Sequence, residues 1–331
     1  MSLPKVSIAI PVYNRETLVQ RAIESALAQT YSEIEIIVVD NCSSDNTYEV
    51  IQKYAQIDKR VKCFRNERNI GPVPNWQRAV EKSQGEYVKI LFSDDWMEPQ
   101  ALERFVQPFQ EYDTNISFTY SRAIIHYLES EETRECYQNI QGGLMDSLDF
   151  LWEHIIWANT PVTPCMALFR RSDLLEFFTL KIPSKVRSDC NNYGIGNDAL
   201  LYWRGCEKYS SCYHISEPVM NLGASVSVEQ PSFTISLINS GKMDMLCQCY
   251  DSAFCYFLAH SNLPKKSKNL LVTGMFLRRM PFRPWLIKSK IAEFNRIFPT
   301  GYKWWNFNFI NKHILGLLKY RIVGSWQKTF N

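Results

Sequence analysis

Short apolar runs alternate with helical segments through the N-terminal part of the chain, and this alternation constrains the fold more than any other feature. Runs rich in β-branched residues predict strands at residues 5–12, 33–40, 61–65 and 87–92. Apolar residues at helical spacing predict helices between them, at residues 15–29, 46–55 and 75–83. Strands that alternate with helices pair in parallel through right-handed crossovers. The sequence therefore predicts an α/β fold with a mostly parallel sheet flanked by helices.

Polar or aromatic side chains stand where three of these strands end. Tyr13 follows the first strand, Asp40 and Asn41 follow the second, and Asp94 and Asp95 follow the fourth. In open α/β sheets, ligands bind at the carboxyl ends of the strands. We therefore expect these residues to converge on one ligand site.

The adjacent carboxylates Asp94 and Asp95 end the apolar run VKILF. Unpaired buried charges are strongly disfavoured, so the pair needs a compensating cation. Mg²⁺ or Mn²⁺ carried by a phosphate ligand would serve, because both ions prefer oxygen ligands. Alternatively, one of the two acids caps a helix predicted from Pro99 to Glu111. This pattern alone leaves both interpretations open.

Several protein classes lose support from what the sequence does not contain. No GxGxxG fingerprint follows the first strand, and no GxxxxGK[ST] phosphate loop is present, which disfavours the dinucleotide-binding and P-loop folds. No apolar stretch approaches the roughly 20 residues that span a bilayer, and the N-terminus resembles a first strand more than a signal peptide. The ten cysteines form no CxxC pair, and most are expected to be buried thiols in a reducing compartment. A cytoplasmic location is therefore expected.

Five motifs occur in order along the N-terminal part of the chain: PVYN, SALAQTY, IIVVDNCSSD, NIG and GEYVKILFSDD. Together they resemble the N-terminal half of family 2 glycosyltransferases, which are inverting, sugar-nucleotide-dependent enzymes of the GT-A fold. The resemblance covers residues 4–120 well and continues to about residue 220. It implies a GT-A domain at residues 1–220, with a nucleotide-binding half to about 120 and an acceptor half beyond. A basic, aromatic-rich helical region would follow at residues 221–331.

The resemblance also implies roles for the residues at the first two strand ends. Pro11 and Tyr13 would line the base pocket, with the tyrosine ring as a stacking face. Asp40 would hydrogen-bond the base or the ribose, and Asn41 stands where many relatives have a second aspartate. The alternative for Tyr13 and Asp40 is an ordinary strand-end aromatic and a turn-capping acid.

Further residues would bind the donor sugar, the phosphates and the metal. Arg65 and Gly71 would approach the sugar or the phosphates, although Arg65 could also be a plain surface charge. Asp94 would lie near the ribose or the donor sugar. Asp95 would be the more direct ligand of Mn²⁺ or Mg²⁺, which neutralises the departing diphosphate.

An inverting transfer also needs a base that takes the proton of the acceptor hydroxyl. The resemblance places it at Asp198, where relatives commonly have Glu-Asp and this chain has Asn197 before the aspartate. The alternative is that Asp198 caps a helix over residues 199–204. Asp189 is a fallback candidate for the base.

The chain departs from the family's pattern after Pro218. Many relatives have an arginine and a histidine there, whereas this chain has Asn221 and Gly223. His214 is a candidate third metal ligand, although a lone histidine at a strand end is more often structural.

Two tryptophans of the predicted acceptor half, Trp152 and Trp157, are candidates for a sugar-stacking platform. Their helical spacing fits core packing equally well.

The last fifth of the chain has a different surface. Residues 264–331 contain 14 Lys plus Arg and the single acid Glu293, interleaved with aromatic residues such as Trp304 and Trp305. Such a tail is attracted to an anionic membrane surface and would bring the enzyme to a lipid-linked acceptor. A helical subdomain that packs its aromatics remains an alternative, and nucleic-acid binding is not expected.

The expected activity is transfer of a sugar from a nucleotide diphosphate-sugar, with UDP the expected nucleotide, to a hydroxyl of a glycan or lipid-linked glycan in bacterial polysaccharide synthesis. The alternatives are a nucleotidyltransferase, which also uses paired carboxylates and metal, and a degenerate glycan- or membrane-binding module.

Overall fold

The computed structural model describes residues 3–112, 115–130, 132–138, 141–156, 160–183, 194–225 and 243–279. The chain divides into two compact units, Met1–Asn262 and Leu263–Asn331. The candidate site lies in the first unit, and each unit is described by itself.

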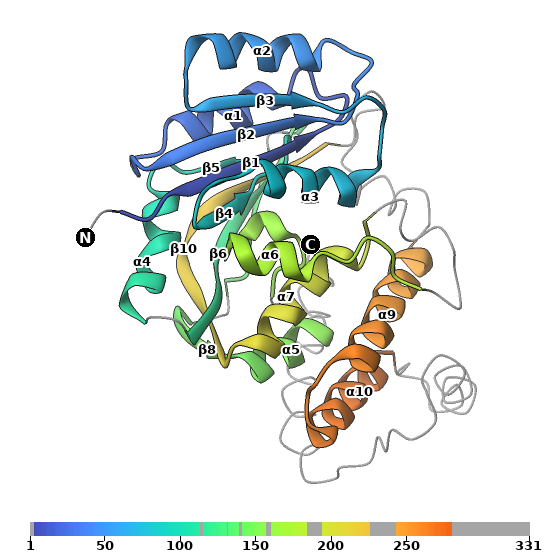
Figure 1. Ribbon diagram of the computed structural model, residues 1–331. Coiled ribbons are helices and arrows are strands. Elements are labelled where there is room, and N and C mark those ends of the chain that lie inside the picture. The colour runs from blue at the N-terminus through green and yellow to red at the C-terminus, as the bar shows by residue number, and fades with distance from the viewer. Residues whose placement is uncertain are drawn as a thin grey trace. The chain divides into compact units, whose positions relative to one another are not determined.

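A ten-stranded sheet forms the centre of the first unit within the described residues, in the order β3-β2-β1-β4-β9-β6-β10-β5, with β7 on β6 and β8 on β10 (Figure 1). The strands are β1 (Val6–Val12), β2 (Ile34–Asp40), β3 (Val61–Arg65), β4 (Tyr87–Ile90), β5 (Trp96–Met97), β6 (Ile116–Tyr127), β7 (Thr133–Cys136), β8 (Gly143–Asp146), β9 (Ala167–Arg170) and β10 (Ser211–Ala224). The first four strands pair in parallel, and so do β6 and β10. Strand β9 lies antiparallel between β4 and β6. The predicted mostly parallel α/β fold is confirmed.

Helices cover the sheet on both faces (Figure 1). Those of the first unit are α1 (Val19–Leu27), α2 (Thr47–Ile57), α3 (Pro72–Lys82), α4 (Ala101–Glu111), α5 (Ser147–Ile155), α6 (Arg171–Phe177), α7 (Asn197–Lys208) and α9 (Met243–His260). Helix α1 contacts α2 and is tied to α4, because Gln29 Oε1 accepts from Leu102 N at 3.0 Å. Helices α3, α6, α7 and α5 contact one another in turn.

The alternation of apolar residues explains how the core is built. All seven residues of β1 and of β2 are buried, as expected for central parallel strands covered on both faces. Alternate β1 residues share one hydrophobic cluster with the buried face of α1 and with α4: Val6, Ile8, Ile10 and Val12. The predicted apolar face of α1 is therefore the face that packs on the sheet.

Two helix starts decide how the site is shaped. Helix α3 begins at Pro72, earlier than the predicted residue 75, because Gly71 adopts a φ of 88° and Pro72 follows at the first helical position. Helix α4 is preceded by Gln100, with no side-chain cap, and strand β5 separates it from the carboxylate pair. The interpretation of Asp94 or Asp95 as a cap of this helix is therefore wrong.

Two further observations on the described residues concern their cysteines and the length of their apolar helices. Of the cysteines that the structure describes, Cys249 is disulfide-bonded and eight others are not. Within the part of the chain that the structure describes, no helix has the length and apolar character needed to cross a bilayer.

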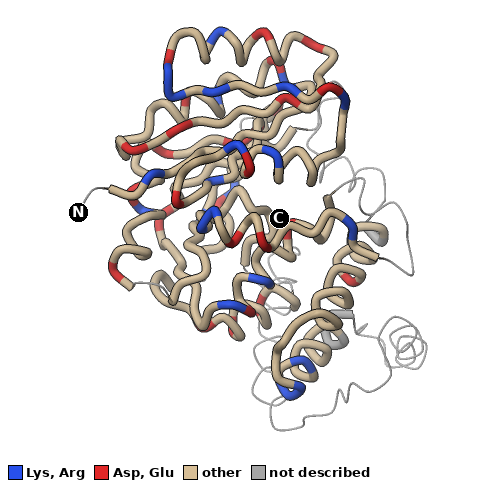
Figure 2. The backbone as a smooth tube through the Cα atoms, viewed as in Figure 1, with Lys and Arg blue, Asp and Glu red and all other residues tan. Residues whose placement is uncertain are grey.

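In the second unit the structure describes helix α10 (Lys265–Arg279). Its first turns carry Lys265, Lys266 and Lys268. Figure 2, in which all lysines and arginines are blue, shows blue segments on this helix. The remaining basic tail, with Trp304 and Trp305, lies outside the described residues.

Candidate active site

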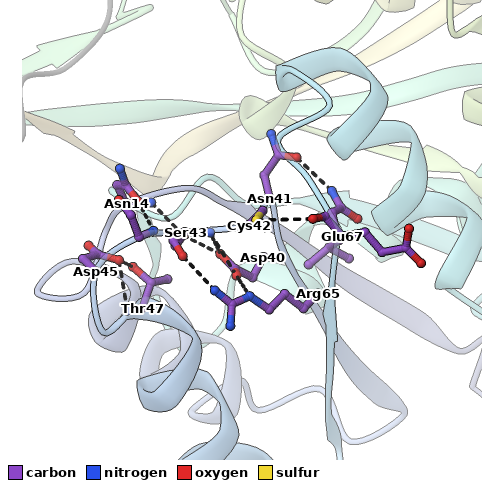
Figure 3. A network of polar contacts seen from close by, with 12 residues as sticks. Asn14, Asp40, Asn41, Cys42, Ser43, Asp45, Thr47, Arg65 and Glu67 are labelled. Carbon is purple, nitrogen blue, oxygen red and sulfur yellow. Dashed lines mark hydrogen bonds and ion pairs between the residues drawn. The ribbon is translucent and has the colours of Figure 1, made fainter.

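The loops that follow β1 and β2 are braced against each other (Figure 3). Asn14 N donates to Ser43 Oγ at 2.9 Å, and Ser44 N donates to Asn14 Oδ1 at 2.9 Å. Asn14 and Cys42 adopt left-handed backbone conformations, with φ of 50° and 63°, which residues other than glycine seldom adopt. Such backbone conformations persist where the surrounding structure enforces them. The two predicted nucleotide loops therefore form one rigid surface at the carboxyl edge of the sheet.

Asp40 lies at the bottom of this surface and is fully buried. Its carboxylate accepts from Ser43 N at 3.2 Å and from Ser43 Oγ, and it forms an ion pair with Arg65 Nε at 3.2 Å (Figure 3). Arg65 also donates to Ser43 O at 2.8 Å, and its side chain is 39% exposed. Burial raises the pKa of Asp40, against the opposing effects of Ser43 and Arg65. Arg65 is therefore more than a plain surface charge, because it is held beside Asp40.

Asn41 organises the next loop rather than presenting a free amide. Its Nδ2 donates to Asn69 Oδ1 at 2.9 Å and to Gly71 O at 3.2 Å, while its Oδ1 accepts from Asn66 Nδ2 at 2.8 Å and from Ile70 N at 3.0 Å. These bonds fill both donors and both acceptor positions of the side chain. A ligand contact by this amide would have to replace one of them. The positive φ of Gly71 then turns the chain into α3.

The first strand ends in two residues of different exposure. Pro11 is buried within β1, whereas Tyr13 is 43% exposed. An exposed ring beside the two braced loops is what stacking on a nucleotide base requires.

The carboxylate pair follows β4. Asp95 is 6% exposed; its Oδ1 accepts from Gly223 N at 3.1 Å, and the Cys165 thiol also hydrogen-bonds the carboxylate. Burial raises the pKa of Asp94, and burial together with repulsion from Asp94 raises the pKa of Asp95 well above its usual value. The protein thus holds two carboxylates in a place where their negative charge is costly.

Three cations of the protein surround this pair, and the sequence patterns identified none of them. Lys89 is fully buried, with Nζ donating to Cys165 O and Ala167 O, and burial lowers its pKa to about 7. Arg21 donates from Nη2 to Asp94 O at 3.0 Å and lies 3.7 Å from the centre of the Trp96 ring. Arg15 and Arg21 both interact electrostatically with Asp94. Arg21 stands in an ordinary helix, and Lys89 lies within the motif GEYVKILFSDD at a position to which the sequence assigned no role.

The pair fits a hard divalent cation. Burial keeps the pKa values of Asp94 and Asp95 raised despite the nearby cations, so a further cation bound at the pair would favour the ionised carboxylates. Among the described residues no cluster of three or more His, Cys, Asp or Glu side chains could hold a metal ion. Any further ligands would be phosphate and water oxygens, as is usual for Mg²⁺.

The interpretation of His214 as a third metal ligand is wrong. His214 is buried near the start of β10, where its Nδ1 lies 3.3 Å from Gln141 O and its ring centre lies 4.8 Å from that of Tyr120. Gly223, which contacts Asp95, lies further along the same strand; the partners of the two residues in β6, Tyr120 and His126, are six residues apart, or roughly 20 Å at about 3.3 Å per residue. His214 is therefore a core residue.

Asn221 and Gly223 instead join β10 to the carboxylate loop. The Asn221 side chain lies 2.8 Å from His126 Nε2 and donates to Glu98 Oε1 at 2.8 Å. A Cβ at Gly223 would lie 2.2 Å from Asp94 O and 3.0 Å from Arg21 Nη2. Only glycine lets the strand approach closely enough for its N–H to reach Asp95.

The Gly223→Ala substitution should displace the carboxylate loop and weaken the binding of nucleotide with metal that the family resemblance implies by about 10-fold or more, because a lost hydrogen bond to a charged group costs about 1.5–3 kcal/mol. Calorimetric titration with UDP and Mn²⁺ measures the effect. Ala224→Gly, which removes a methyl group from the next residue of β10, controls for general loosening of the strand. Unchanged affinity in Gly223→Ala would contradict this account of the loop.

Asp198 lies in the first turn of α7. Its Oδ1 accepts from Gly196 N at 2.9 Å and from Ala199 N at 2.8 Å, and its Oδ2 accepts from Tyr250 OH at 2.8 Å. Burial raises the pKa of Asp198 to about 6, although these hydrogen bonds oppose the shift. The residue before the helix is Gly196, so Asp198 is not itself in the cap position. The fallback candidate Asp189 lies outside the described residues.

The tryptophans proposed as an acceptor platform are not a pair of exposed rings. Trp152 is 5% exposed within α5, so its sugar-stacking interpretation is wrong and the core-packing interpretation is confirmed. Trp157 lies outside the described residues.

Comparison with known sequences identifies relatives of the N-terminal part of the chain. An uncharacterized glycosyltransferase of Haemophilus influenzae is 40% identical over 104 residues, 31% of this chain and 42% of that protein. The putative teichuronic acid biosynthesis glycosyltransferase TuaG of Bacillus subtilis is 35% identical over 116 residues, 35% of this chain and 46% of its own. A GalNAc(5)-diNAcBac-PP-undecaprenol beta-1,3-glucosyltransferase of Campylobacter jejuni is 36% identical over 110 residues, 33% of this chain and 36% of that protein. The matches span less than half the length of these curated relatives.

Solved structures with the same fold cover much more of the chain. S. aureus TarS 1–349, determined in complex with UDP-GlcNAc, has a TM-score of 0.63 at 16% identity over 89% of this chain and 82% of TarS 1–349. The mannosyltransferase PcManGT from Pyrobaculum calidifontis, in complex with GDP-Man and Mn²⁺, has a TM-score of 0.54 at 16% identity over 87% of this chain and 73% of its own. At these identities the likeness shows the fold alone.

The family model described as Glycosyl transferase family 2 matches residues 7–178, which is more than half of the chain. The matched residues include the loops after β1 and β2 and the carboxylate pair after β4. The chain therefore belongs to glycosyltransferase family 2 and has the GT-A fold.

Proposed function

We propose that the protein transfers a sugar from a UDP-sugar, with inversion, to a hydroxyl of a glycan or lipid-linked glycan during synthesis of a bacterial cell-surface polysaccharide. The observation that carries the proposal is the carboxylate pair of half-buried Asp94 and buried Asp95, placed at the same sheet edge as the braced loops. The UDP-GlcNAc complex of TarS supports the choice of donor class. The undecaprenol-linked substrate named for the Campylobacter relative supports the acceptor class.

The braced loops would hold the nucleotide. Tyr13 would stack on the base along the edge formed by Pro11, and Asp40, oriented by Ser43 and Arg65, would accept a hydrogen bond from the base or the ribose. Gly71, whose position Asn41 fixes, would let the backbone approach the donor sugar. This assignment gives Asn41 an indirect role in donor binding.

The carboxylate pair would act on the leaving group. Asp95 would ligate the metal and Asp94 would contact the ribose or the donor sugar. When bound, Mn²⁺ or Mg²⁺ neutralises the negative charge that builds on the departing diphosphate. The Mn²⁺ complex of PcManGT supports this assignment. Arg21, beside the pair, would add positive charge at the place where this chain has no arginine or histidine after Pro218.

Asp198 would activate the acceptor. As the acceptor oxygen bonds to the anomeric carbon, the bond from that carbon to the diphosphate oxygen breaks, and the acceptor's proton passes to Asp198 Oδ2. A pKa of about 6 keeps most of the carboxylate ionised at neutral pH and close to the pH at which a base works best. Attack opposite the leaving group produces inversion.

The second unit would keep the enzyme at a lipid-linked acceptor. The lysines at the start of α10 and the basic, aromatic-rich sequence of residues 264–331 support peripheral binding to an anionic membrane surface, with the enzyme on the cytoplasmic side. Each cation near such a surface contributes about 1 kcal/mol.

Product analysis tests the proposed reaction. The full chain is incubated with UDP-sugars, dTDP-sugars and GDP-sugars, with and without Mn²⁺, and the nucleotide products are separated. We expect UDP to appear from one UDP-sugar, only with Mn²⁺, with faster turnover when a lipid-linked glycan is added. A parallel incubation with nucleoside triphosphates and sugar 1-phosphates tests the alternative, because release of pyrophosphate from these substrates would identify a nucleotidyltransferase. Binding of nucleotide without turnover on any donor and acceptor would identify a degenerate binding module.

A further inference from the structure

Helix α9 packs directly against the turn that leads to Asp198. Gly196 in this turn has a φ of 87°, and a Cβ there would lie 2.6 Å from the Cβ of Ala253 and 3.2 Å from Cys249 O. Glycine is therefore needed at this position for two reasons: it permits the left-handed backbone conformation, and it leaves room for α9 to pack closely. Ile195 of the same turn lies in one hydrophobic cluster with Met245 and Cys249 of α9.

The opposite side of the turn is held by the nucleotide-binding half. Gly194 has a φ of 71°, and a Cβ there would lie 3.0 Å from the Trp76 ring and 3.1 Å from Val73 of α3. Further along α7, the Trp203 ring centre lies 5.7 Å from those of Phe254 and Phe257 of α9. The turn and the start of α7 are thus fixed between α3 and α9.

One polar contact from α9 reaches the carboxylate itself. Tyr250 OH donates to Asp198 Oδ2 at 2.8 Å, while the two backbone N–H groups bond Oδ1. A carboxylate oxygen has two lone pairs, so Oδ2 retains an acceptor position. That position is where an acceptor hydroxyl would bind.

We propose that Tyr250 is a positioning residue for the catalytic base, holding Oδ2 of Asp198 toward the acceptor and stabilising its ionised form. The inference rests on the proposed role of Asp198. It extends the active site into a helix beyond residue 178, where the family model ends. A hydrogen bond donated to the ionised form of a carboxyl favours that form. A base whose orientation is fixed by a third group is the usual arrangement for activation of a hydroxyl.

Among the described residues, Tyr250 supplies the side-chain hydrogen bond to Asp198, and the other donors are backbone N–H groups. The titratable groups that interact there are phenols: Tyr202 of α7 interacts with Asp198, and Tyr137 interacts with Tyr250. The effects that lower the pKa of Asp198 come first from Tyr250 and then from backbone N–H groups. Loss of the phenol should therefore move the titration of the base upward.

The test compares pH profiles of kcat for the full chain and for Tyr250→Phe. We expect the inflection of the acid limb to rise by about 0.5–1 pH unit, because the ionised base loses one hydrogen bond. At pH 5.5 turnover should fall several-fold, while at pH 8.5 it should stay within about 3-fold and the Kd for UDP should be unchanged. Tyr256→Phe, on the same helix, is the matched control and should leave the profile unmoved.

The outcomes separate this inference from the proposed function. If Asp198→Asn abolishes turnover but Tyr250→Phe leaves the inflection in place, the positioning role is overturned and the base assignment stands. If Asp198→Asn retains turnover, the base assignment itself fails. Should Tyr250→Phe fail to fold, Tyr250 is replaced by p-fluorophenylalanine, which nearly keeps the size of the ring but removes the donor. A raised inflection supports the inference, and an unmoved inflection overturns it.

Discussion

Asp198→Asn should lower kcat by about 10³-fold while leaving the Kd for UDP and Mn²⁺ unchanged, because general-base catalysis contributes about 10²–10⁴-fold. Asparagine keeps an oxygen for the backbone N–H groups of residues 196 and 199, so the start of α7 should be preserved. It cannot take a proton from the acceptor. Turnover is measured by UDP release at saturating donor and acceptor, and binding by calorimetry.

The pH dependence of turnover in the unmodified protein is a second test of Asp198 as the base. A base must be ionised to act, and the pKa of Asp198 is raised to about 6. Turnover should therefore be full above pH 7 and decline as the pH falls through about 6. Asp149→Asn is the control, since Asp149 is an exposed acid in the first turn of α5. A loss in Asp198→Asn of less than about 10-fold would contradict the assignment of the base.

Asp95→Asn should abolish the stabilisation of the protein by UDP with Mn²⁺. A ligand at 100 times its Kd stabilises the folded state by about 2.7 kcal/mol, which raises the Tm of a domain of this size by a few degrees. The substitution removes the charge that a divalent cation needs, while its oxygen can still accept from Gly223 N. Turnover should fall by about 10²–10³-fold with the loss of leaving-group stabilisation. Differential scanning fluorimetry with UDP, Mn²⁺ and both together measures the stabilisation.

The free protein should respond in the opposite direction. Removal of one of two repelling buried carboxylates relieves unfavourable charge, so Asp95→Asn without ligand should have a Tm at least equal to that of the unmodified protein. Asp58→Asn, which removes a carboxylate paired with Arg60 away from the site, should respond to UDP and Mn²⁺ as the unmodified protein does. Stabilisation by UDP and Mn²⁺ that persists in Asp95→Asn would show that the pair is not the metal site.

Local patterns predict the start of the nucleotide-binding half well, because its first three strands pair in the order in which they follow one another in the chain. The strands that end at Val12, Asp40 and Arg65 are consecutive and pair as neighbours, so strand-end residues meet without any long-range information. Strand β9 shows the limit. Its sequence ALFR is a short apolar run, yet nothing local indicates that it enters antiparallel between β4 and β6.

The residues that complete the site escape prediction for the same reason. Gly223 lies 128 residues from its partner Asp95, and Tyr250 lies 52 residues from Asp198. A single glycine in a strand and a single tyrosine in an apolar helix carry no motif. His214 is the opposite case. It is near Gly223 in sequence, but the two residues lie far apart in space because the strand between them is extended.

The close contact between Gly194 and Trp76 bears on the distance between Asp198 and the carboxylate pair. Trp76, against which the turn rests, has its ring centre 5.2 Å from that of Phe92, and Phe92 is followed directly by the segment Ser93, Asp94 and Asp95. The proposed base and the carboxylate pair are therefore connected through two tilted aromatic rings and a glycine, rather than through surface loops. A scaffold built this way can change its outer loops to accommodate a different sugar or acceptor while the spacing between Asp198 and the carboxylate pair is kept.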